Sequence, residues 1–398
     1  MSDAILVINA GSSSIKFKLY ALGQEEALET VFSGVLDGIG GEARLKAKDG
    51  AGQPLDERSL DKGAAADPGA AQKIVMDWLG DHLGSHSMIG VGHRVVHGGP
   101  TFTHPVIVDA DVMKTLESFI PLAPLHQLGN LDPIRLLRKE HPGLLQVACF
   151  DTAFHRDHPE LSDRFALPRA LYDEGVRRYG FHGLSYEYVS GALRRLAPGI
   201  AEGRVVIAHL GSGASLCALQ GGKSIETTMS FTALDGIPMG TRSGAIDPGV
   251  ILHLIEQKGM SAHDIGTMLY RESGLLGLSG ISNDVRALLA SDDPRAAMAL
   301  DFFSRRVAQA VASLAVSIGG LDALVFTAGI GENAPEIRRR VVDALAFAGL
   351  VLDGEANARS DLHVEVKGSP IAILVVPTDE ERMIARHTRA LLNAGEGG

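Results

Sequence analysis

A pattern of apolar strand, small polar loop and second strand occurs twice in this chain, about 200 residues apart. The first copy runs from Ile5 to Leu19 and the second from Val205 to Leu219. Backbone N–H groups and hydroxyls in such loops can hold phosphate oxygens, although Ser and Gly are also common in ordinary turns. The first loop, Asn9 to Ser14, is not a P-loop, because the G-x-x-x-x-G-K-[ST] pattern is absent and a strand follows it. The repeat predicts two related domains whose loops meet one polyphosphate in a cleft between them.

Composition narrows the class of protein. The chain has 398 residues, of which 45% are hydrophobic and 21% charged, as in a globular protein of about two or three domains. Its net charge of -11, without a long basic run, argues against nucleic acid or a membrane surface as a partner. Cys149 and Cys217 lie in apolar segments and are expected to be buried free thiols. We see no signal peptide or apolar run of about 20 residues, so the expected compartment is the cytoplasm.

A charged residue inside an apolar strand is the next constraint. The segment 89–100 predicts a buried strand that carries Arg94 and ends in a Gly-Gly-Pro turn. A buried arginine needs an anionic partner, which is either a ligand or an internal carboxylate. His93 and His97 flank it, but their surroundings lack further ligands at metal spacing, so we expect no metal there.

Further polar side chains follow strands or stand in loops bounded by Gly or Pro. Asp151 follows the expected strand 147–150, at the end where ligand groups sit in open α/β sheets, or it caps the next helix. The loop residues are His126 in 121–127, His182 in 177–183 and Arg242 in 235–244. A second arginine able to face an anion favours ligand contact for Arg94 as well.

The last third of the chain predicts a nucleotide contact and an acidic helix start. A strand is followed by the glycine loop 329–333 and by Pro335 in a first helical turn, which fits nucleotide contact without nicotinamide chemistry. The strand 371–376 leads to Asp379, Glu380 and Glu381, which either favour the helix dipole or coordinate magnesium. Other expected elements are helices at 70–83, 130–139, 186–196 and 300–319, β structure at 31–50 and a polar connection at 50–68.

Together these motifs resemble the acetate kinase family. The resemblance is carried in order by the segments 9–16, 92–99, 125–126, 150–155, 180–183, 209–213, 239–244, 329–333 and 377–381, and covers essentially the whole chain. It implies an α/β fold of two RNase-H-like (actin-like ATPase) domains with a nucleotide cleft between them. We place the domains at 1–151 plus 382–398, and at 152–381. The family also suggests a homodimer.

The resemblance implies reversible phosphoryl transfer from ATP to acetate, giving ADP and acetyl phosphate, with Mg²⁺ as cofactor and Mn²⁺ as an alternative. The metal and phosphate would be positioned by Asn9 and Glu380. Arg94 and Arg242 would bind the acetate carboxylate and the phosphoryl group, with Asp151 beside the reacting centre and His182 stabilising the transition state. The acetate pocket would comprise Arg94, Val96, Leu125 and Phe181. The residues assigned to ATP are Lys16, His126, His209, Leu210, Gly211, Ser212, Gly213, Asp284, Val285, Arg286, Gly329, Ile330, Gly331, Glu332, Asn333 and Ile337.

These residue types suit a carboxylate acceptor. A carboxylate is already ionised at neutral pH, so it needs no general base, but its negative charge must be screened from the polyphosphate. Three positions depart from the family pattern: Gln127 and Asp379 stand where Asn is usual, and Ala233 replaces a proline of the acetate pocket in some members. Asp379 adds a carboxylate beside the proposed metal ligand. A wider pocket leaves propionate as an alternative substrate, because one methylene is worth only ~1–3 kcal/mol.

Other classes of protein remain as alternatives. One is a sugar or glycerol kinase of the same fold with Asp151 as base, which the paired arginines disfavour. Another is a non-enzymatic ATP-binding module of the actin or Hsp70 type. A serine hydrolase is disfavoured because the chain lacks a G-x-S-x-G elbow.

Overall fold

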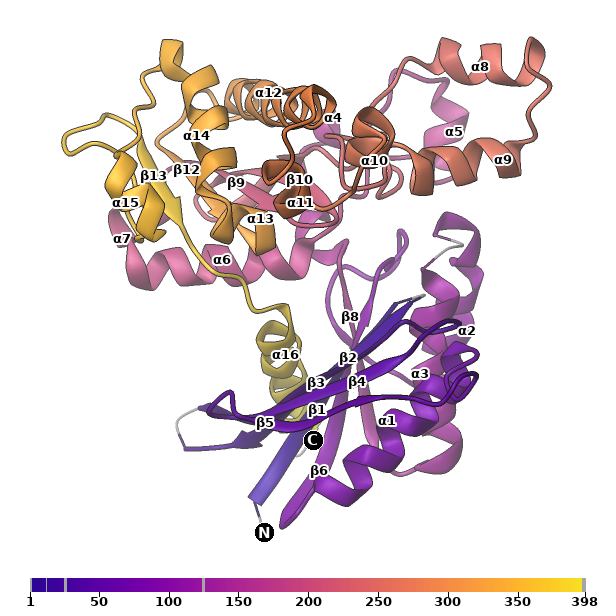
Figure 1. Ribbon diagram of the computed structural model, residues 1–398. Coiled ribbons are helices and arrows are strands. Elements are labelled where there is room, and N and C mark those ends of the chain that lie inside the picture. Colours follow the sequence, from indigo (N-terminus) through magenta and orange to yellow (C-terminus); the bar gives the residue numbers. More distant parts are fainter. Residues whose placement is uncertain (1, 12, 25–26, 124–125, 396–398) are drawn as a thin grey trace. The chain divides into compact units, whose positions relative to one another are not determined.

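The computed structural model describes residues 2–11, 13–24, 27–123 and 126–395, and the chain divides into two compact units (Figure 1). The first unit comprises 1–154 and 379–398, and the second comprises 155–378. The chain passes from one unit to the other after residue 154 and returns before residue 379, whereas we expected these boundaries after 151 and before 382. The difference matters at Glu380, which belongs to the first unit because it begins a helix that packs on that unit's sheet.

The first unit is built on an eight-stranded sheet of order β5-β4-β3-β2-β1-β6-β8-β7. Strands β1 to β5 form an antiparallel meander, whereas β1, β6 and β8 run parallel. The strands are β1 (Ser2–Ala10), β2 (Ser14–Leu22), β3 (Leu28–Asp37), β4 (Arg44–Asp49), β5 (Pro54–Ser59), β6 (His86–Val95), β7 (Val106–Ile107) and β8 (Leu145–Phe150). Its longer helices are α1 (Pro68–His82), α2 (Ala110–Ser118), α3 (Gln127–Glu140) and α16 (Glu380–Gly395).

Helix α1 closes the main core of this unit. Its Trp78 packs against Phe17 and Phe32 with ring centroids 5.3 and 5.2 Å apart, and its indole N–H donates to Asp56 on β5. The buried side chains of β1 to β4 and of α1 form one hydrophobic cluster. The burial of this apolar surface stabilises the unit by about 25 cal/mol per Å².

Helix α16 covers the same sheet over β6, β1 and β8 (Figure 1). It approaches closely because β6 carries Gly90 and Gly92 where it passes. A β-carbon added at Gly92 would lie 2.4 Å from Thr388 Oγ1 and 2.5 Å from a methyl carbon of Ile384. This packing fixes the start of α16, and therefore Glu380, at the carboxyl end of β6.

The second unit repeats the strand pattern of the first. Its five-stranded sheet has the order β11-β10-β9-β12-β13, in which β9 pairs antiparallel with β10 and parallel with β12. β1 has the same relation to β2 and β6. The strands are β9 (Arg204–Leu210), β10 (Ala214–Gln220), β11 (Lys223–Thr227), β12 (Ala323–Thr327) and β13 (Ala372–Val375). The prediction of a duplicated α/β domain is confirmed.

Helices enclose this second sheet on both faces, with α12 and α14 on one side and α6 on the other (Figure 1). The longer helices are α6 (Gly183–Leu196), α8 (Pro248–Glu256), α12 (Pro294–Ser317) and α14 (Pro335–Ala344). Shorter ones are α4 (Glu160–Asp163), α5 (Arg169–Asp173), α7 (Pro198–Ala201), α9 (Ala262–Thr267), α10 (Gly274–Ser279), α11 (Val285–Leu289), α13 (Ala328–Asn333) and α15 (Gly354–Arg359). A single π-helical turn, Met268–Glu272, follows α9, and 3₁₀ turns lie at Ile120–Leu122, Ala153–His155 and Ala346–Ala348.

Most predicted elements are present, and two local predictions were wrong. The polar connection 50–68 contains the edge strand β5, and the glycine loop 329–333 is the helix α13. Pro335 begins α14 as expected, and both cysteines are buried thiols. Within the described residues, no helix is long and apolar enough to cross a membrane.

Candidate active site

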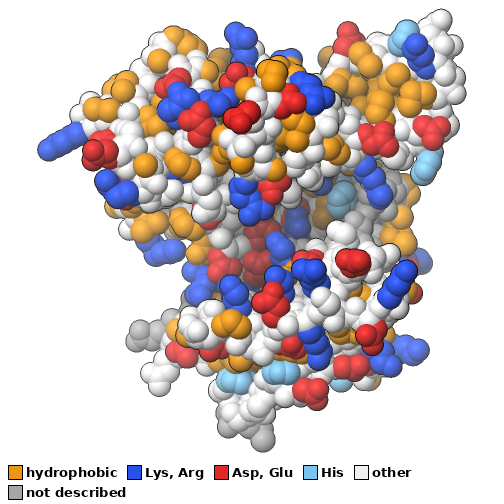
Figure 2. All heavy atoms as spheres, viewed as in Figure 1, with side chains coloured by type: hydrophobic (Ala, Val, Ile, Leu, Met, Phe, Trp, Pro, Cys, Tyr) orange, Lys and Arg blue, Asp and Glu red, His pale blue; other side chains and the backbone are white. Residues whose placement is uncertain are grey.

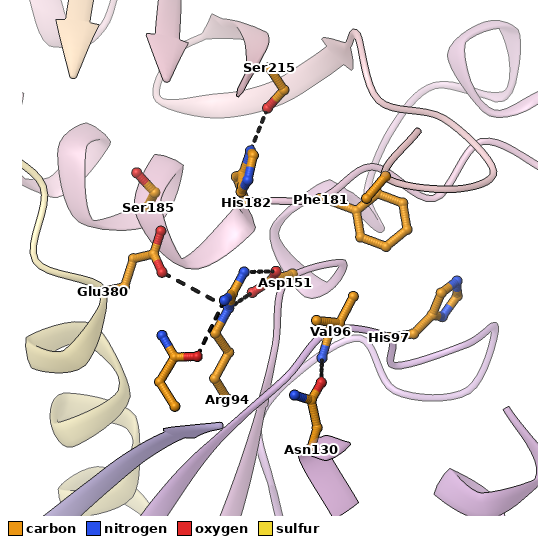
Figure 3. Close-up of polar contacts among 12 residues, drawn as sticks. Arg94, Val96, His97, Asn130, Asp151, Phe181, His182, Ser185, Ser215 and Glu380 are labelled. Carbon is orange, nitrogen blue, oxygen red and sulfur yellow. Dashed lines mark hydrogen bonds and ion pairs between the residues drawn. The ribbon is translucent and has the colours of Figure 1, made fainter. Parts of the chain in front are cut away.

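In the first unit, Arg94 at the end of β6 lies among oxygen atoms from three other segments (Figure 3). Its Nε and Nη2 donate to the two carboxylate oxygens of Asp151 at 2.9 and 2.6 Å, and Nη1 donates to Asn9 Oδ1 at 3.3 Å. The internal carboxylate partner is therefore observed, and contact of Arg94 with a ligand stays a prediction. Two of the five N–H groups of Arg94 make no hydrogen bond within the described residues.

Asp151 is fixed by this pairing. It is 2% exposed, and both of its oxygens accept from the arginine in a bidentate pair. Burial alone would lower the pKa of Arg94, but the charges of Asp151 and Glu380 hold it above its ordinary value. Asp151 thus positions Arg94 and keeps it charged, and it is poorly placed to act as a general base.

Glu380 completes this group from the first turn of α16. Its Oε2 lies 3.9 Å from Arg94 Nε, and its side chain is 16% exposed. Burial raises the pKa of Glu380 to about 7, with Asp151 and Glu381 adding to the rise and Arg94 opposing it. The group holds more carboxylate than cationic charge, which favours a further cation beside it.

Asp379 does not add a carboxylate to that group as the sequence suggested. Its Oδ1 accepts from the backbone N–H of Arg382 at 2.9 Å, which caps α16. Its Oδ2 lies 3.2 Å from Lys18 Nζ, and Tyr20 donates to Oδ1 at 3.4 Å. The departure from Asn at this position therefore ties the start of α16 to β2.

Two buried amides of α3 hold the backbone on which this group is built. Asn130 accepts from the N–H of Val96 at 2.9 Å (Figure 3) and donates to the carbonyl of Ala10 at 2.6 Å. Gln127 accepts from the N–H of His97 at 3.3 Å and donates to its carbonyl at 3.1 Å. The ends of β1 and β6 are thereby joined through α3.

Replacing Asn130 with alanine should destabilise the first unit by about 2 kcal/mol or more, because it leaves two buried backbone groups without partners. The measurement is urea unfolding followed by tryptophan fluorescence, since the one tryptophan, Trp78, lies in this unit. Gln53→Ala, which removes an exposed amide of the same unit, is the matched control. An equal stability of the two variants would contradict the anchoring role.

The other predicted residues of the first unit do not belong to the group of side chains around Arg94. Lys16 is exposed on β2 and pairs in register with Asn9 on β1. Val96 is buried, and His126 precedes α3 without capping it through its side chain. Leu125 lies outside the described residues.

In the second unit, His182 occupies the turn that begins α6. Its φ of 57° is in the left-handed region that side chains other than glycine rarely adopt. Its Nδ1 lies 2.8 Å from Ser215 Oγ (Figure 3), and its ring stacks on His209 with centroids 4.2 Å apart. Phe181 beside it is 2% exposed, and its carbonyl accepts from Nε2 of His155.

The loop Gly211–Gly213 joins β9 to β10, and predicted residues of the second unit gather around it. A β-carbon added at Gly213 would lie 3.4 Å from His182 Nε2 and 3.8 Å from Arg242 Nη1. Ser212 accepts from the N–H of Gly240, so the arginine loop lies against this one. Arg242 Nη1 donates to the carbonyl of Ala233 at 2.9 Å. A histidine and an arginine thus converge on a glycine loop.

The predicted nucleotide segment adjoins the same loop. Helix α13 begins at Ala328, whose φ is 65° and whose Cβ would lie 3.7 Å from a β-carbon built on Gly211. Glu332 accepts from the N–H of Thr378, and Asn333 donates to the carbonyl of Gly329. Of the three non-glycine residues with positive φ in the described chain, His182 and Ala328 both flank this loop, and such strain is common at functional sites.

Several residues assigned to ATP present no surface to a ligand. Ile337, Leu210 and Val285 are 0%, 0% and 3% exposed and belong to the core behind the loops. Asp284 caps α11 and is paired with Arg286 at 2.6 Å, and this pairing lowers the pKa of Asp284. The place of Ile337 near the nucleoside therefore stays a prediction, and its side chain is packed in the core. Among the residues of the second unit assigned to ATP, the exposed ones are Ser212, Arg286, Gly329 and Asn333.

The family follows from comparison with known proteins. The model of the acetokinase family matches residues 4–386. The chain belongs to the acetokinase family. An acetate kinase from Nitrobacter hamburgensis is 54% identical over 390 residues, which is 98% of this chain and 96% of that protein. A crystal structure of a propionate kinase from Francisella tularensis has a TM-score of 0.89 at 38% identity, covering 98% of this chain and 100% of that one. The crystal structure of Porphyromonas gingivalis acetate kinase has a TM-score of 0.87 at 36% identity, covering 98% of this chain and 100% of that one.

The acetokinase-family motifs pointed to polar residues at strand ends and in loops, and they missed the residues that hold these segments in place. Asn130 shares a helix face with Ile134 and Leu137, so a polar residue on an apolar stripe was the available signal. Arg338 gives the same signal in α14: it is fully buried and donates to the carbonyls of Gly331 and Glu332 at the end of α13. Ser215 offered no signal, because β10 is buried on both faces.

A cavity of about 1020 Å³ in the second unit lies apart from these residues. It is lined by side chains such as Ile237, Met268 and Phe302, and by none of the predicted site residues. Its size alone therefore does not make it the active site of this member of the acetokinase family.

Proposed function

We propose that the protein catalyses reversible phosphoryl transfer between ATP and acetate, giving ADP and acetyl phosphate. The observation that carries the proposal is the bidentate pair of Arg94 and Asp151. It leaves a charged guanidinium with two N–H groups for an anion, and it occupies the carboxylate that a hydroxyl acceptor would need as base. The acetate kinase names of relatives at 50–54% identity support the same acceptor.

In this reaction the protein has to bring one anion to another. Arg94 and Arg242 neutralise the carboxylate and the transferring group, while His182 donates to the equatorial phosphoryl oxygens. The loop Gly211–Gly213 offers backbone N–H groups to the polyphosphate. Asp151 acts through Arg94 as a positioning residue.

Propionate is the second candidate substrate. The solved Francisella tularensis propionate kinase shares the fold at 38% identity. Ala233, whose carbonyl holds Arg242, is smaller than the proline of some family members. One methylene changes selectivity by only ~1–3 kcal/mol, so activity on both acids is expected, with acetate preferred.

The experiment is a parallel measurement of ADP release with acetate, propionate, butyrate and glycerol. The proposal expects the highest kcat/KM with acetate and no turnover with glycerol. ADP formation only with glycerol, or with none of the four compounds, would reject it. A higher kcat/KM with propionate would assign the second candidate instead.

Magnesium is part of the proposal. Asn9 and Glu380 offer one amide and one carboxylate oxygen, the donor type that Mg²⁺ prefers, and Mg²⁺ completes its coordination with water and substrate phosphates. No group of three or more His, Cys, Asp or Glu among the described residues could hold a metal by itself. The excess of carboxylate charge around Arg94 fits a divalent cation, Mg²⁺ or alternatively Mn²⁺. When bound, the ion neutralises phosphate charge.

Glu380→Gln should raise the Mg²⁺ concentration for half-maximal activity by about tenfold or more, because a carboxylate ligand becomes a neutral amide. The measurement is the initial rate at saturating ATP and acetate over a magnesium titration. Glu381→Gln, which changes the neighbouring carboxylate, is the control and should leave the titration close to that of the wild type. An unchanged titration for Glu380→Gln would reject its role as a ligand.

We also propose a homodimer that associates through α8. This helix has no buried residue in the single chain. Its apolar residues Val250, Leu252 and Ile255 are therefore left 45%, 57% and 45% exposed. Figure 2 shows apolar side chains gathered in the part of the second unit where Figure 1 labels α8 and α9. Exposed apolar side chains on a helix that the single chain leaves uncovered are typical of an association face.

Leu252→Asp should convert the dimer to a monomer, since a charge would have to be buried on each side of the interface. Sedimentation velocity at micromolar concentration is the measurement. Phe347→Asp replaces another exposed apolar residue, 81% exposed, and should leave the dimer intact. A wild-type protein that sediments as a monomer would refute the dimer itself.

The cytoplasmic location and the absence of nucleic acid and membrane partners stay predictions from the sequence. The net charge of -11 is the observation that supports the second of these predictions.

A further inference from the structure

Ser215 and Tyr186 lie behind His182 in a chain of hydrogen bonds. Tyr186 Oη lies 2.5 Å from Ser215 Oγ, which lies 2.8 Å from His182 Nδ1. Both Ser215 and Tyr186 are 0% exposed. Neither residue carries a role in the proposed function.

The positions of these residues follow from the fold. Tyr186 is one helical turn after His182 on α6, and its backbone N–H donates to the carbonyl of His182. Ser215 is on β10, directly opposite His209 on β9, whose ring stacks on His182. Helix α6 and the β9–β10 hairpin therefore hold the imidazole from two sides.

We propose that Tyr186 and Ser215 are positioning residues that fix His182 in the tautomer with its hydrogen on Nε2. Each hydroxyl has one hydrogen to donate. A phenol is a stronger hydrogen-bond donor than an alcohol, and an alcohol oxygen is the better acceptor, so Tyr186 donates to Ser215. Ser215 then donates to Nδ1 of His182, and Nδ1 accepts.

The consequence is a donor facing the glycine loop. With Nδ1 accepting, the ring hydrogen sits on Nε2, the atom that would lie 3.4 Å from a β-carbon at Gly213. The opposite tautomer would turn a lone pair toward phosphoryl oxygens and repel them. This inference rests on the proposed function for the identity of the ligand, but the tautomer exists without any ligand.

The first test reads the tautomer in the ligand-free protein by ¹⁵N NMR of labelled histidine. The His182 signals are assigned by their loss in His182→Gln. We expect a protonated Nε2 and an unprotonated Nδ1 in the wild type. We expect Ser215→Ala to shift the equilibrium toward protonated Nδ1. A wild-type His182 protonated on Nδ1 alone would overturn the proposal, whatever the activity of the protein.

The second test separates orientation from substrate binding. Ser215→Ala should lower kcat by about tenfold or more with little change in the KM for ATP, as expected when a residue that orients a catalytic group is lost. Tyr186→Phe removes one oxygen atom and should lower kcat less. Tyr179→Phe removes another buried phenol hydroxyl of this unit, one that donates to the carbonyl of Gly175, and should leave kcat unchanged.

The outcomes of the two tests are independent. If His182 has the proposed tautomer but the protein has no carboxylate kinase activity, the positioning of His182 by Tyr186 and Ser215 stands and the proposed function is rejected. Full kcat in both Ser215→Ala and Tyr186→Phe would reject the positioning role. Should Ser215→Ala fail to fold, Tyr186→Phe still decides, because its loss of donation must weaken the preference for the Nε2 tautomer.

Discussion

Replacing Arg94 with alanine should lower kcat by about 10²- to 10³-fold, which corresponds to the loss of about 3 kcal/mol or more of transition-state stabilisation. The guanidinium is the cation that the fold places beside Asp151, Asn9 and Glu380, and its two remaining N–H groups are the donors available to an anion. Steady-state kinetics with acetate and ATP measure the loss. Arg94→Lys should recover little, because an ammonium cannot form the bidentate pair with Asp151.

The substitution also leaves Asp151 buried without its partner, so folding has to be separated from chemistry. In the double variant Arg94→Ala/Asp151→Asn the buried charge is gone, and stability should recover while kcat does not. Arg135→Ala is the matched control, since Arg135 is a partly exposed arginine paired with Glu117 and Asp132 in the same unit. Near-normal kcat in Arg94→Ala, or recovery of activity in the double variant, would contradict the assignment.

Replacing Arg242 with alanine should lower kcat to a similar extent, by about 3 kcal/mol of barrier. Its guanidinium is oriented by the carbonyl of Ala233 and converges with His182 on the glycine loop. The loop that carries it is held by backbone hydrogen bonds, among them Met239 N–H to the carbonyl of residue 242, which the substitution keeps. Thermal unfolding should therefore be almost unchanged.

Two comparisons sharpen the test of Arg242. Arg242→Lys keeps the charge without the planar fork and should give an intermediate kcat. Arg295→Ala removes an arginine of the same unit that is paired with Asp293 at the surface, and should have no effect. A loss confined to the KM for acetate, with kcat intact, would show that Arg242 binds the acid without acting on the transferring group.

The sequence predicted the architecture well because two of its patterns, a strand–loop–strand repeat and a charge in an apolar strand, each restrict the possible structures strongly. The strand–loop–strand repeat specifies two antiparallel hairpins, and the structure has them as β1–β2 and β9–β10 in equivalent sheets. Arg94 was identifiable because a charge in an apolar strand requires a partner. Its partner Asp151 was identifiable from its place after β8.

The remaining features depend on tertiary contacts that local patterns do not contain. The segment 329–333 has the composition of a loop, yet it is helical because the buried guanidinium of Arg338 satisfies the carbonyls of Gly331 and Glu332. Ile337 follows a ligand-binding motif, but it is on the apolar face of α14 with Val341 and packs in the core. In the segment 329–333, tertiary packing overrode the local preference for a loop.

Asp379 illustrates the same limit at the site itself. Its neighbour Glu380 suggested that it would add to a metal site, but Lys18 and Tyr20 on β2 bind it from a segment about 360 residues away. Only the folded sheet brings these groups together. A carboxylate that looked like a ligand is a helix cap with a cationic partner.

The most direct test of the account is the chemical nature of the product. The purified protein is incubated with ATP, magnesium, acetate and glycerol at equal acceptor concentrations, and ³¹P NMR follows the new phosphorus signal before and after addition of hydroxylamine. A carboxylate kinase gives an acyl phosphate, whose signal disappears with hydroxylamine as the hydroxamate forms. A hydroxylamine-stable phosphomonoester, or ADP with inorganic phosphate alone, would contradict the account.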